Sequence, residues 1–411
     1  MTKRTITAAA VALLAAITAC GQGPVPARVV RIDSGGADTG SVYAFPYSWA
    51  GQVPGGHPAA WMGPEGFLFG ANSHNAALPY LMSDGEHLSA SFTGWAAWLS
   101  GHVVSLDLDE DSAVSWLERA SETDLARLRL VSVPDSLPST LRPAIERLAT
   151  ANPSVGLFFD SQAEMDVILP RFRPRTLWLD NSARLTSGHA AVQRQIESLS
   201  MSAESSGSLA VLRELPKLRH LLLDEWDTQQ PGQLPADLEA LTAFNSTVDM
   251  SRLGDLPRLR LLILSGSEWH GAADLAALKK LRWLGLPSNA TQVEFAAIVR
   301  THPDLEVLDL VFADSVIDLS PLRGAHRLRA LTLGGQFRNF DVLRELNSLK
   351  FVGLSNDIWE DSPDQVAAIR AALPGAVVVK VTPLCLGSGW ILLLIPAALF
   401  VMLAGRRTRR A

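Results

Sequence analysis

A short strand phrase, Leu-x-x-Leu-x-Leu, recurs along most of this chain of 411 residues and limits the folds open to it. Clear copies span 218–223, 259–264, 281–286, 305–310 and 328–333, and looser copies lie at 103–108, 125–130, 157–159, 177–179, 199–201 and 349–354. Their middle apolar residues are Leu106, Leu128, Leu157, Leu177, Leu199, Leu221, Leu241, Leu262, Leu284, Leu308, Leu331 and Val352. Successive middle residues are 20 to 29 residues apart, an interval typical of stacked repeats.

The phrase predicts one short strand per repeat, because its positions 4 and 6 point to the same side of an extended chain. One such strand cannot bury its own apolar face, so neighbouring repeats must stack. Between the strands, segments 272–280, 292–300 and 365–373 have apolar residues at helical spacing. Strands that alternate with helices predict a parallel sheet on the inner side of a curved solenoid.

The chain resembles the leucine-rich-repeat family over about residues 101–381, most clearly from Leu218 to Leu354. The resemblance implies an α/β solenoid with a curved parallel sheet on the concave side and with helices and loops on the convex side. The family places an asparagine three residues after the second strand leucine, where it hydrogen-bonds the turn backbone. Asn289 occupies that position, but the other repeats have different residues there. We therefore expect an irregular array within a domain of residues 101–382.

The N-terminal segment 1–19 has the pattern of an export signal, with Lys3 and Arg4 before a short apolar stretch. Its end, Ile17 to Gly21, resembles the lipobox of bacterial lipoproteins, which implies lipidation of Cys20. A plain cleavage site with a coincidental cysteine is the alternative. The following residues, 20–40, are rich in glycine and are predicted to form a flexible linker.

Near the C-terminus, residues 384–404 contain no charged side chain and are long enough for a transmembrane helix. The basic tail 405–411 follows and is expected in the cytoplasm. A buried core helix and a cleaved sorting signal are the alternatives. Both ends together predict a protein of the bacterial cytoplasmic (inner) membrane with its repeats on the extracytoplasmic side. The outer membrane or cell surface is the alternative location.

Residues 41–100 differ from the repeats, because they are rich in tryptophan, glycine and proline. We interpret this region as an N-terminal cap over the first repeat, since a solenoid needs its open end covered. A separate small binding module is the alternative.

Composition excludes several kinds of function. The two cysteines are Cys20 and Cys385, so the repeats contain no thiolate for zinc or for catalysis. Without Lys3, Arg4 and the four arginines of the tail, 30 basic residues stand against 42 acidic ones, a net charge of −12. This balance argues against nucleic acid and favours a neutral or cationic partner. We expect no metal and no cofactor, because neither a metal-binding histidine spacing nor a phosphate-binding loop is found.

A row of aspartates follows the strands and is the first candidate binding site. Position 7 of the phrase is Asp109, Asp160, Asp180 and Asp224, and Asp309 adds a carboxylate at position 5. These positions are expected on the concave face, where the row predicts contact with a positively charged ligand. The alternative is that each aspartate bonds the backbone of the following turn, as short polar side chains often do.

Three aromatic residues are also predicted to project from the concave face: Trp178, Trp283 and Phe351. Exposed aromatics on such a surface are typical interface anchors. The alternative is that the cap or a long loop covers them.

The family resemblance implies a non-enzymatic scaffold that binds another protein or peptide through its concave face. Two alternatives belong to other classes of function. The acids and tryptophans could bind or process envelope carbohydrate, or the protein could associate with itself into a structural surface layer.

Overall fold

The computed structural model describes residues 25–30, 32–33, 42–48, 61–63, 66–68, 77–81, 87–92, 96–99, 102–128, 130–179, 183–203, 208–228, 234–264, 267–310, 316–349 and 351–380. The predicted signal segment, linker, transmembrane segment and basic tail lie wholly or largely outside these residues. Within the described part, no helix is long and apolar enough to cross a membrane.

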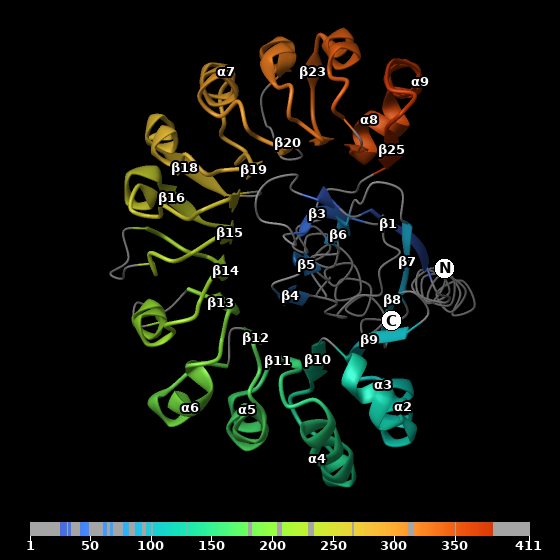
Figure 1. Ribbon diagram of the computed structural model, residues 1–411, viewed down its shortest axis with the longest axis vertical. Coiled ribbons are helices and arrows are strands. Elements are labelled where there is room, and N and C mark those ends of the chain that lie inside the picture. The colour runs from blue at the N-terminus through green and yellow to red at the C-terminus, as the bar shows by residue number, and fades with distance from the viewer. Residues whose placement is uncertain are drawn as a thin grey trace, which may run out of the picture.

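Parallel strands from β9 to β25 form one continuous curved ladder, and Figure 1 shows them lining the inside of a ring. The strands are β9 (His102–Asp107), β10 (Leu130–Val133), β11 (Gly156–Phe159), β12 (Thr176–Leu179), β13 (Ser198–Ser202), β14 (His220–Asp224), β15 (Ala240–Phe244), β17 (Leu261–Ile263), β19 (Trp283–Gly285), β20 (Val307–Leu310), β22 (Ala330–Leu333), β24 (Phe351–Leu354) and β25 (Val377–Lys380). The predicted parallel sheet of a leucine-rich-repeat solenoid is confirmed.

The predicted register is confirmed from Leu157 to Val352, because the middle residue of each phrase pairs with the middle residue of the next. It is wrong at Leu128, since the partner of Leu106 is Val131. The phrase at this point is therefore shifted by three residues. The ladder also continues beyond Val352, which pairs with Val378 in β25.

Leucines of the phrase form the core. In the repeat of β14, Leu218, Leu221 and Leu223 are all at most 1% exposed, and they belong to one buried cluster that runs through the whole solenoid. Burial of each such side chain contributes about 1.5–3 kcal/mol to the hydrophobic free energy of folding. The periodicity of the sequence therefore determines which face of every strand turns away from the inside of the ring.

Return segments between the strands lie on the outside of the ring (Figure 1). The α-helices are α2 (Asp111–Arg119), α3 (Glu122–Arg127), α4 (Arg142–Ala151), α5 (Gln162–Ile168), α6 (Ala190–Gln193), α7 (Gln292–Thr301), α8 (Asn356–Asp361) and α9 (Pro363–Ala372). The 3₁₀ helices are η1 (Ser139–Leu141), η2 (Leu169–Arg171), η3 (Ser187–His189), η4 (Ser208–Glu214), η5 (Met250–Leu253), η6 (Ala272–Ala277), η7 (Ser320–Gly324) and η8 (Phe340–Glu345).

The helices predicted at 292–300 and 365–373 are confirmed as α7 and α9. The segment 272–280 is instead the short 3₁₀ helix η6 followed by a turn. Its repeat also has to accommodate an outer strand, β18 (Glu268–His270), before η6 begins. Few residues then remain for the return, and the tighter 3₁₀ helix is common in such short pieces.

Short outer strands pair in parallel behind the inner sheet, and the sequence pattern did not predict them. They are β16 (Thr247–Asp249) with β18, and β21 (Ile317–Asp318) with β23 (Phe337–Arg338). The turn that leads to them is held by polar side chains. Asn289 donates from Nδ2 to the Trp269 carbonyl at 3.0 Å and accepts from the Trp269 N–H at 3.2 Å, so its predicted role is confirmed.

Serine performs this task where asparagine is missing. The Ser246 hydroxyl accepts from the Trp226 N–H at 2.9 Å, and the Ser267 hydroxyl accepts from the Ser246 N–H at 3.0 Å. A hydroxyl on each repeat thus satisfies a backbone N–H of the repeat before it.

Antiparallel strands precede the repeats. Strands β7 (His87–Phe92) and β8 (Ala96–Leu99) extend the sheet beyond β9, and β1 (Val25–Val30) pairs with β7. The remaining short strands are β2 (Ile32–Asp33), β3 (Val42–Ser48), β4 (Trp61–Gly63), β5 (Gly66–Leu68) and β6 (Ala77–Leu81). Strand β4 contacts β12, which lies on the inner side of the ring. The domain boundaries and the cap assignment stay predictions.

Candidate functional site

The inner face of the ring is formed by phrase positions 3 and 5, whose side chains lie opposite the leucine core. Most of these side chains are buried in this structure, although the inner face of an open solenoid is exposed to solvent. The buried members include Phe158, Thr176, Ser200, Leu222, Thr242, Ile263, Val307, Ala330 and Thr332. Strand β4 contacts β12, one strand of this sheet.

The three predicted aromatics have different environments. Trp283 is 0% exposed and is therefore not a free aromatic on the surface of this structure. Trp178 is partly exposed and packs edge-to-face on Phe158, with ring centroids 5.8 Å apart and an interplanar angle of 86°. Phe351 is the first residue of β24, and its side chain lies outside the described part of the structure.

The predicted aspartates are also placed differently. Asp109 is exposed, Asp160 and Asp224 are partly buried, and Asp180 lies outside the described residues. Asp309 is buried and accepts a hydrogen bond from the Thr332 hydroxyl on the next strand. We define the acidic edge as Asp109, Asp160 and Asp224, which follow the C-terminal ends of β9, β11 and β14.

Local contacts explain part of this row. The Asp224 carboxylate accepts from Asn245 Nδ2 at 2.9 Å, and Asn245 has a left-handed φ of 47°. The bond goes to a side chain of the following repeat, whereas the alternative interpretation placed it on the backbone of the following turn. A carboxylate at this position ties two neighbouring repeats together.

Burial dominates the electrostatics at the first strand. It is the main cause that raises the pKa of the Asp107 carboxyl from 3.8 to about 7, and the nearby charges of Asp109 and Glu110 contribute to that increase. Hydrogen bonds from the Asp109 N–H, at 3.2 Å, and from Ser132 oppose the increase. Burial and the Asp135 carboxylate also raise the pKa of Asp109. The carboxyls here thus resist ionisation.

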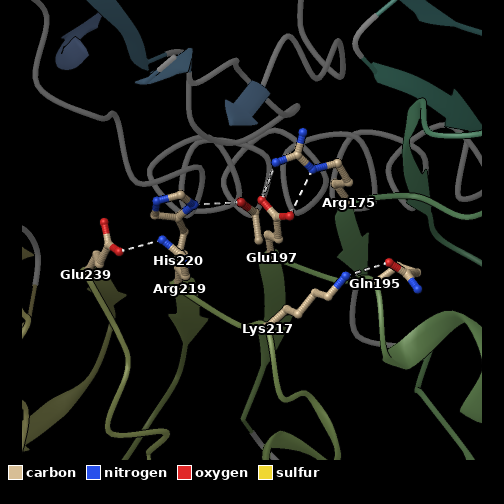
Figure 2. A network of polar contacts seen from close by, with 8 residues as sticks. Arg175, Gln195, Glu197, Lys217, Arg219, His220 and Glu239 are labelled. Atoms are coloured by element: carbon tan, nitrogen blue, oxygen red, sulfur yellow. Dashed lines mark hydrogen bonds and ion pairs between the residues drawn. The ribbon is translucent and has the colours of Figure 1, made fainter. Parts of the chain in front are cut away.

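A second charged feature lies at the opposite edge of the sheet, where the strands begin. Arg175 Nε and Nη2 donate to the two carboxylate oxygens of Glu197 at 3.0 and 2.6 Å, and Arg219 Nη1 donates to Glu239 at 2.9 Å. Figure 2 shows these side chains side by side on successive strands. We call this row of cross-repeat pairs the charged ladder.

A second row of polar contacts lies beside the charged ladder, two residues earlier in each repeat, and we call it the outer rail. Its pairs are Lys217 with Gln195 at 2.9 Å, Arg258 with Asp237 at 3.0 Å, and Arg327 with Asp304 at 3.0 Å. The ladder does not involve positions 3, 5 and 7, on which the predicted binding site rests. Position 2 carries the signal, since it reads Arg175, Glu197, Arg219, Glu239, Arg260, Arg282, Glu306 and Arg329 on successive strands.

Two buried groups lie beneath the ladder. The His220 ring nitrogen Nδ1 lies 2.9 Å from the Ser198 hydroxyl, and burial lowers the pKa of His220 to about 4. The imidazole is therefore neutral at pH 7. Ser198 is only 1% exposed, so the pair belongs to the buried part of the sheet.

Glu306 is the buried member of the ladder itself. Burial raises its pKa, and the positive charges of Arg329, Arg282 and Arg260 oppose that increase. Its Oε1 lies 3.8 Å from Arg282 Nε, while Oε2 has no hydrogen-bond partner in the described part of the chain. The carboxylate is held mainly by the surrounding guanidinium charges.

The strand phrase, its leucine core and the parallel register define a solenoid of the leucine-rich-repeat type. No family model and no curated protein matches the chain. Among solved structures, an internalin from Listeria monocytogenes has 15% identity and a TM-score of 0.37, covering 65% of this chain and 86% of that one. A leucine-rich-repeat protein from Leptospira interrogans has 14% identity and a TM-score of 0.34, covering 62% and 72%. The fold assignment rests on the ladder of strands, not on these scores.

Among the described residues, no three histidine, cysteine, aspartate or glutamate side chains are grouped as metal ligands would be. The chemistry that this site offers is charge recognition along two edges of one sheet.

Proposed function

We propose that this protein is a non-enzymatic leucine-rich-repeat scaffold that binds another protein or peptide. The observation that carries the proposal is the uninterrupted sheet from β9 to β25, which fixes a row of charged side chains at strand spacing along the edge where the strands begin. At the other edge the same sheet carries the acidic edge. Rigid, repeated positions of this kind suit recognition of an extended partner surface. Fold alone does not select the partner.

The acidic edge, together with Asp180, is proposed as the contact for a neutral or cationic part of the partner. Asp309, Trp178, Trp283 and Phe351 belong to the proposed concave surface as well. Trp283 and Asp309 are buried. Asp109 is exposed, and Asp160 and Asp224 are partly exposed, so the acidic edge is the part of the surface that a partner can contact directly.

Membrane attachment is the second part of the proposal, and its support is the sequence. Export by segment 1–19, a lipid on Cys20 and a transmembrane helix at 384–404 would hold the repeats on the extracytoplasmic side of the cytoplasmic membrane. The outer membrane or cell surface is the alternative address. Incorporation of a labelled fatty acid that is abolished by Cys20→Ser tests the lipid, and protease treatment of spheroplasts tests which side the repeats face.

Capture of a partner from solubilised envelope tests the binding function. The bait is the full-length protein, beside a variant with Asp109, Asp160 and Asp224 changed to Asn. A matched control changes Asp255, Asp361 and Asp364, exposed acids of the return segments, to Asn. We expect the parent and the control to retain one specific protein that the edge variant loses. Absence of any specific protein with the parent would contradict the binding function, and equal capture by all three would remove the acidic edge from it.

A further inference from the structure

Charge is distributed unevenly along the edge of the sheet that carries the charged ladder. From β12 to β15 the charged ladder and the outer rail together contain four basic residues and three acids. The basic residues are Arg173, Arg175, Lys217 and Arg219, and the acids are Glu197, Asp237 and Glu239. From β17 to β22 the two rows contain six basic residues against two acids, Asp304 and Glu306. We define the basic edge as those six residues, which are Arg258, Arg260, Lys280, Arg282, Arg327 and Arg329. The positive excess contrasts with the net charge of −6 of the whole chain.

The excess begins where the alternation of the ladder breaks. Arg175 and Arg219 each have a glutamate beside them on the next strand. Arg260 is followed by Arg282, because Leu261 and Trp283 are paired residues of neighbouring strands. Two guanidinium groups are thus brought to strand spacing, about 4.8 Å between backbones, where an arginine and a glutamate stand elsewhere.

The molecule itself shows how this edge binds a carboxylate. Asp304 accepts from two sides, since Arg282 Nη1 lies 3.2 Å from one of its oxygens and Arg327 Nη1 lies 3.0 Å from the other. Glu197 is bound in the bidentate manner by Arg175. Planar guanidinium groups match a carboxylate in this way and are preferred over ammonium groups for it.

The basic edge is also accessible. The side chains of Arg258 and Arg327 are 53% and 64% exposed, and Lys280 is exposed as well. Their ion pairs with Asp237 and Asp304 are surface pairs that contribute little to folding, so exchange for a partner's carboxylate costs the fold little.

We propose that the basic edge docks an acidic segment of the partner protein, so that the partner's carboxylates join the ladder between the arginines of β17, β19 and β22. This inference rests on the proposed binding function and adds a second contact, opposite in charge to the acidic edge. An extended phosphate polymer fits less well, because the acidic residues elsewhere on the molecule repel it, whereas a short acidic segment can be confined to one edge.

The test measures binding of a fluorescent octaglutamate peptide to the full-length protein by anisotropy, with octaglutamine as the uncharged control peptide. The edge variant combines Arg258→Gln, Lys280→Gln and Arg327→Gln. The control variant loses the same charge at Arg142→Gln, Arg213→Gln and Arg344→Gln, exposed residues of α4, η4 and η8. We expect octaglutamate to bind the parent and the control alike and the edge variant about tenfold more weakly, with affinity falling as salt rises.

Three outcomes would overturn the inference. One is that octaglutamate does not bind the parent. Another is that the control variant loses as much affinity as the edge variant, which would reduce the effect to overall charge. The third is that polyphosphate or vesicles of anionic phospholipid bind the edge more tightly than octaglutamate does. Circular dichroism of each variant verifies folding. If a partner captured from the envelope is still bound by the variant with Arg258→Gln, Lys280→Gln and Arg327→Gln, this inference fails, while the binding function stays in place.

Discussion

The two edges of the parallel sheet carry charge in opposite ways. At the edge where strands begin, Arg175 meets Glu197 and Arg219 meets Glu239, so strand spacing brings unlike charges together. At the other edge, Asp107 and Asp109 lie among further carboxylates, and the pKa of both is raised. Strand spacing stabilises the unlike pairs at the first edge, whereas at the other edge burial is the main cause of the raised pKa values and neighbouring carboxylates add to it.

The largest effect is expected from Asp107→Asn. The folded-state pKa of Asp107 is raised from its ordinary value of 3.8 to about 7, so the folded protein binds the proton more tightly than the unfolded chain does. The stability contributed by the protonated carboxyl is complete below pH 3.8 and is lost as pH rises through 7. At pH 8 the variant should exceed the parent by on the order of 3 kcal/mol in free energy of unfolding.

Urea unfolding at pH 4 and at pH 8 measures the difference between the two proteins. The parent and the variant should approach each other at pH 4, where the parent carboxyl is largely protonated. Asp111→Asn, which removes an exposed carboxylate of the same region, is the control. Equal stability of the parent and Asp107→Asn at pH 8 would show that the ionised Asp107 carboxylate imposes no cost on the folded state.

An intermediate effect is expected at the buried part of the ladder. Arg282→Ala removes one of the guanidinium groups around Glu306 and should lower the free energy of unfolding by about 2 kcal/mol, because the buried carboxylate loses counter-charge. The double change Arg282→Ala with Glu306→Leu should recover most of that loss. Chemical denaturation compares them, and no recovery in the double variant would mean that Arg282 acts by packing alone.

The smallest effect is expected at the exposed part of the ladder. A double-mutant cycle on Arg175 and Glu197, each changed to Ala, should give a coupling free energy of about 0.5 kcal/mol that falls when salt is raised. The pair is partly exposed and screened, in contrast to Glu306. A coupling as large as the effect of Arg282→Ala would erase the distinction between the two parts of the ladder.

The fold followed from the sequence where the apolar pattern was unambiguous. From Leu157 to Val352 a single register places the core leucines together, and a slip would turn polar residues inward. The prediction failed at Leu128 because Leu125, Leu128 and Leu130 imitate the phrase while Leu125 already belongs to α3. The spacing of the leucines cannot distinguish a true strand phrase from this imitation, whereas the pairing of Leu106 with Val131 does.

The candidate site was only partly predictable. The Asn289 turn followed from the family resemblance, and the aspartate row could be read from position 7. The ladder needed comparison of one position across repeats, because its glutamates and arginines are ordinary surface residues when taken singly.

The varying thickness of the return segments has a mechanical consequence. A repeat with an α-helix outside, such as α4 or α7, is wider at its back than a repeat that returns through a 3₁₀ helix such as η6. A repeat that is wide on its convex side increases the curvature of the solenoid at that point, whereas a narrow repeat decreases it. The order of α-helical and 3₁₀-helical repeats along the chain thus determines the inner diameter of the ring, and with it the size of the molecule that the ring can surround.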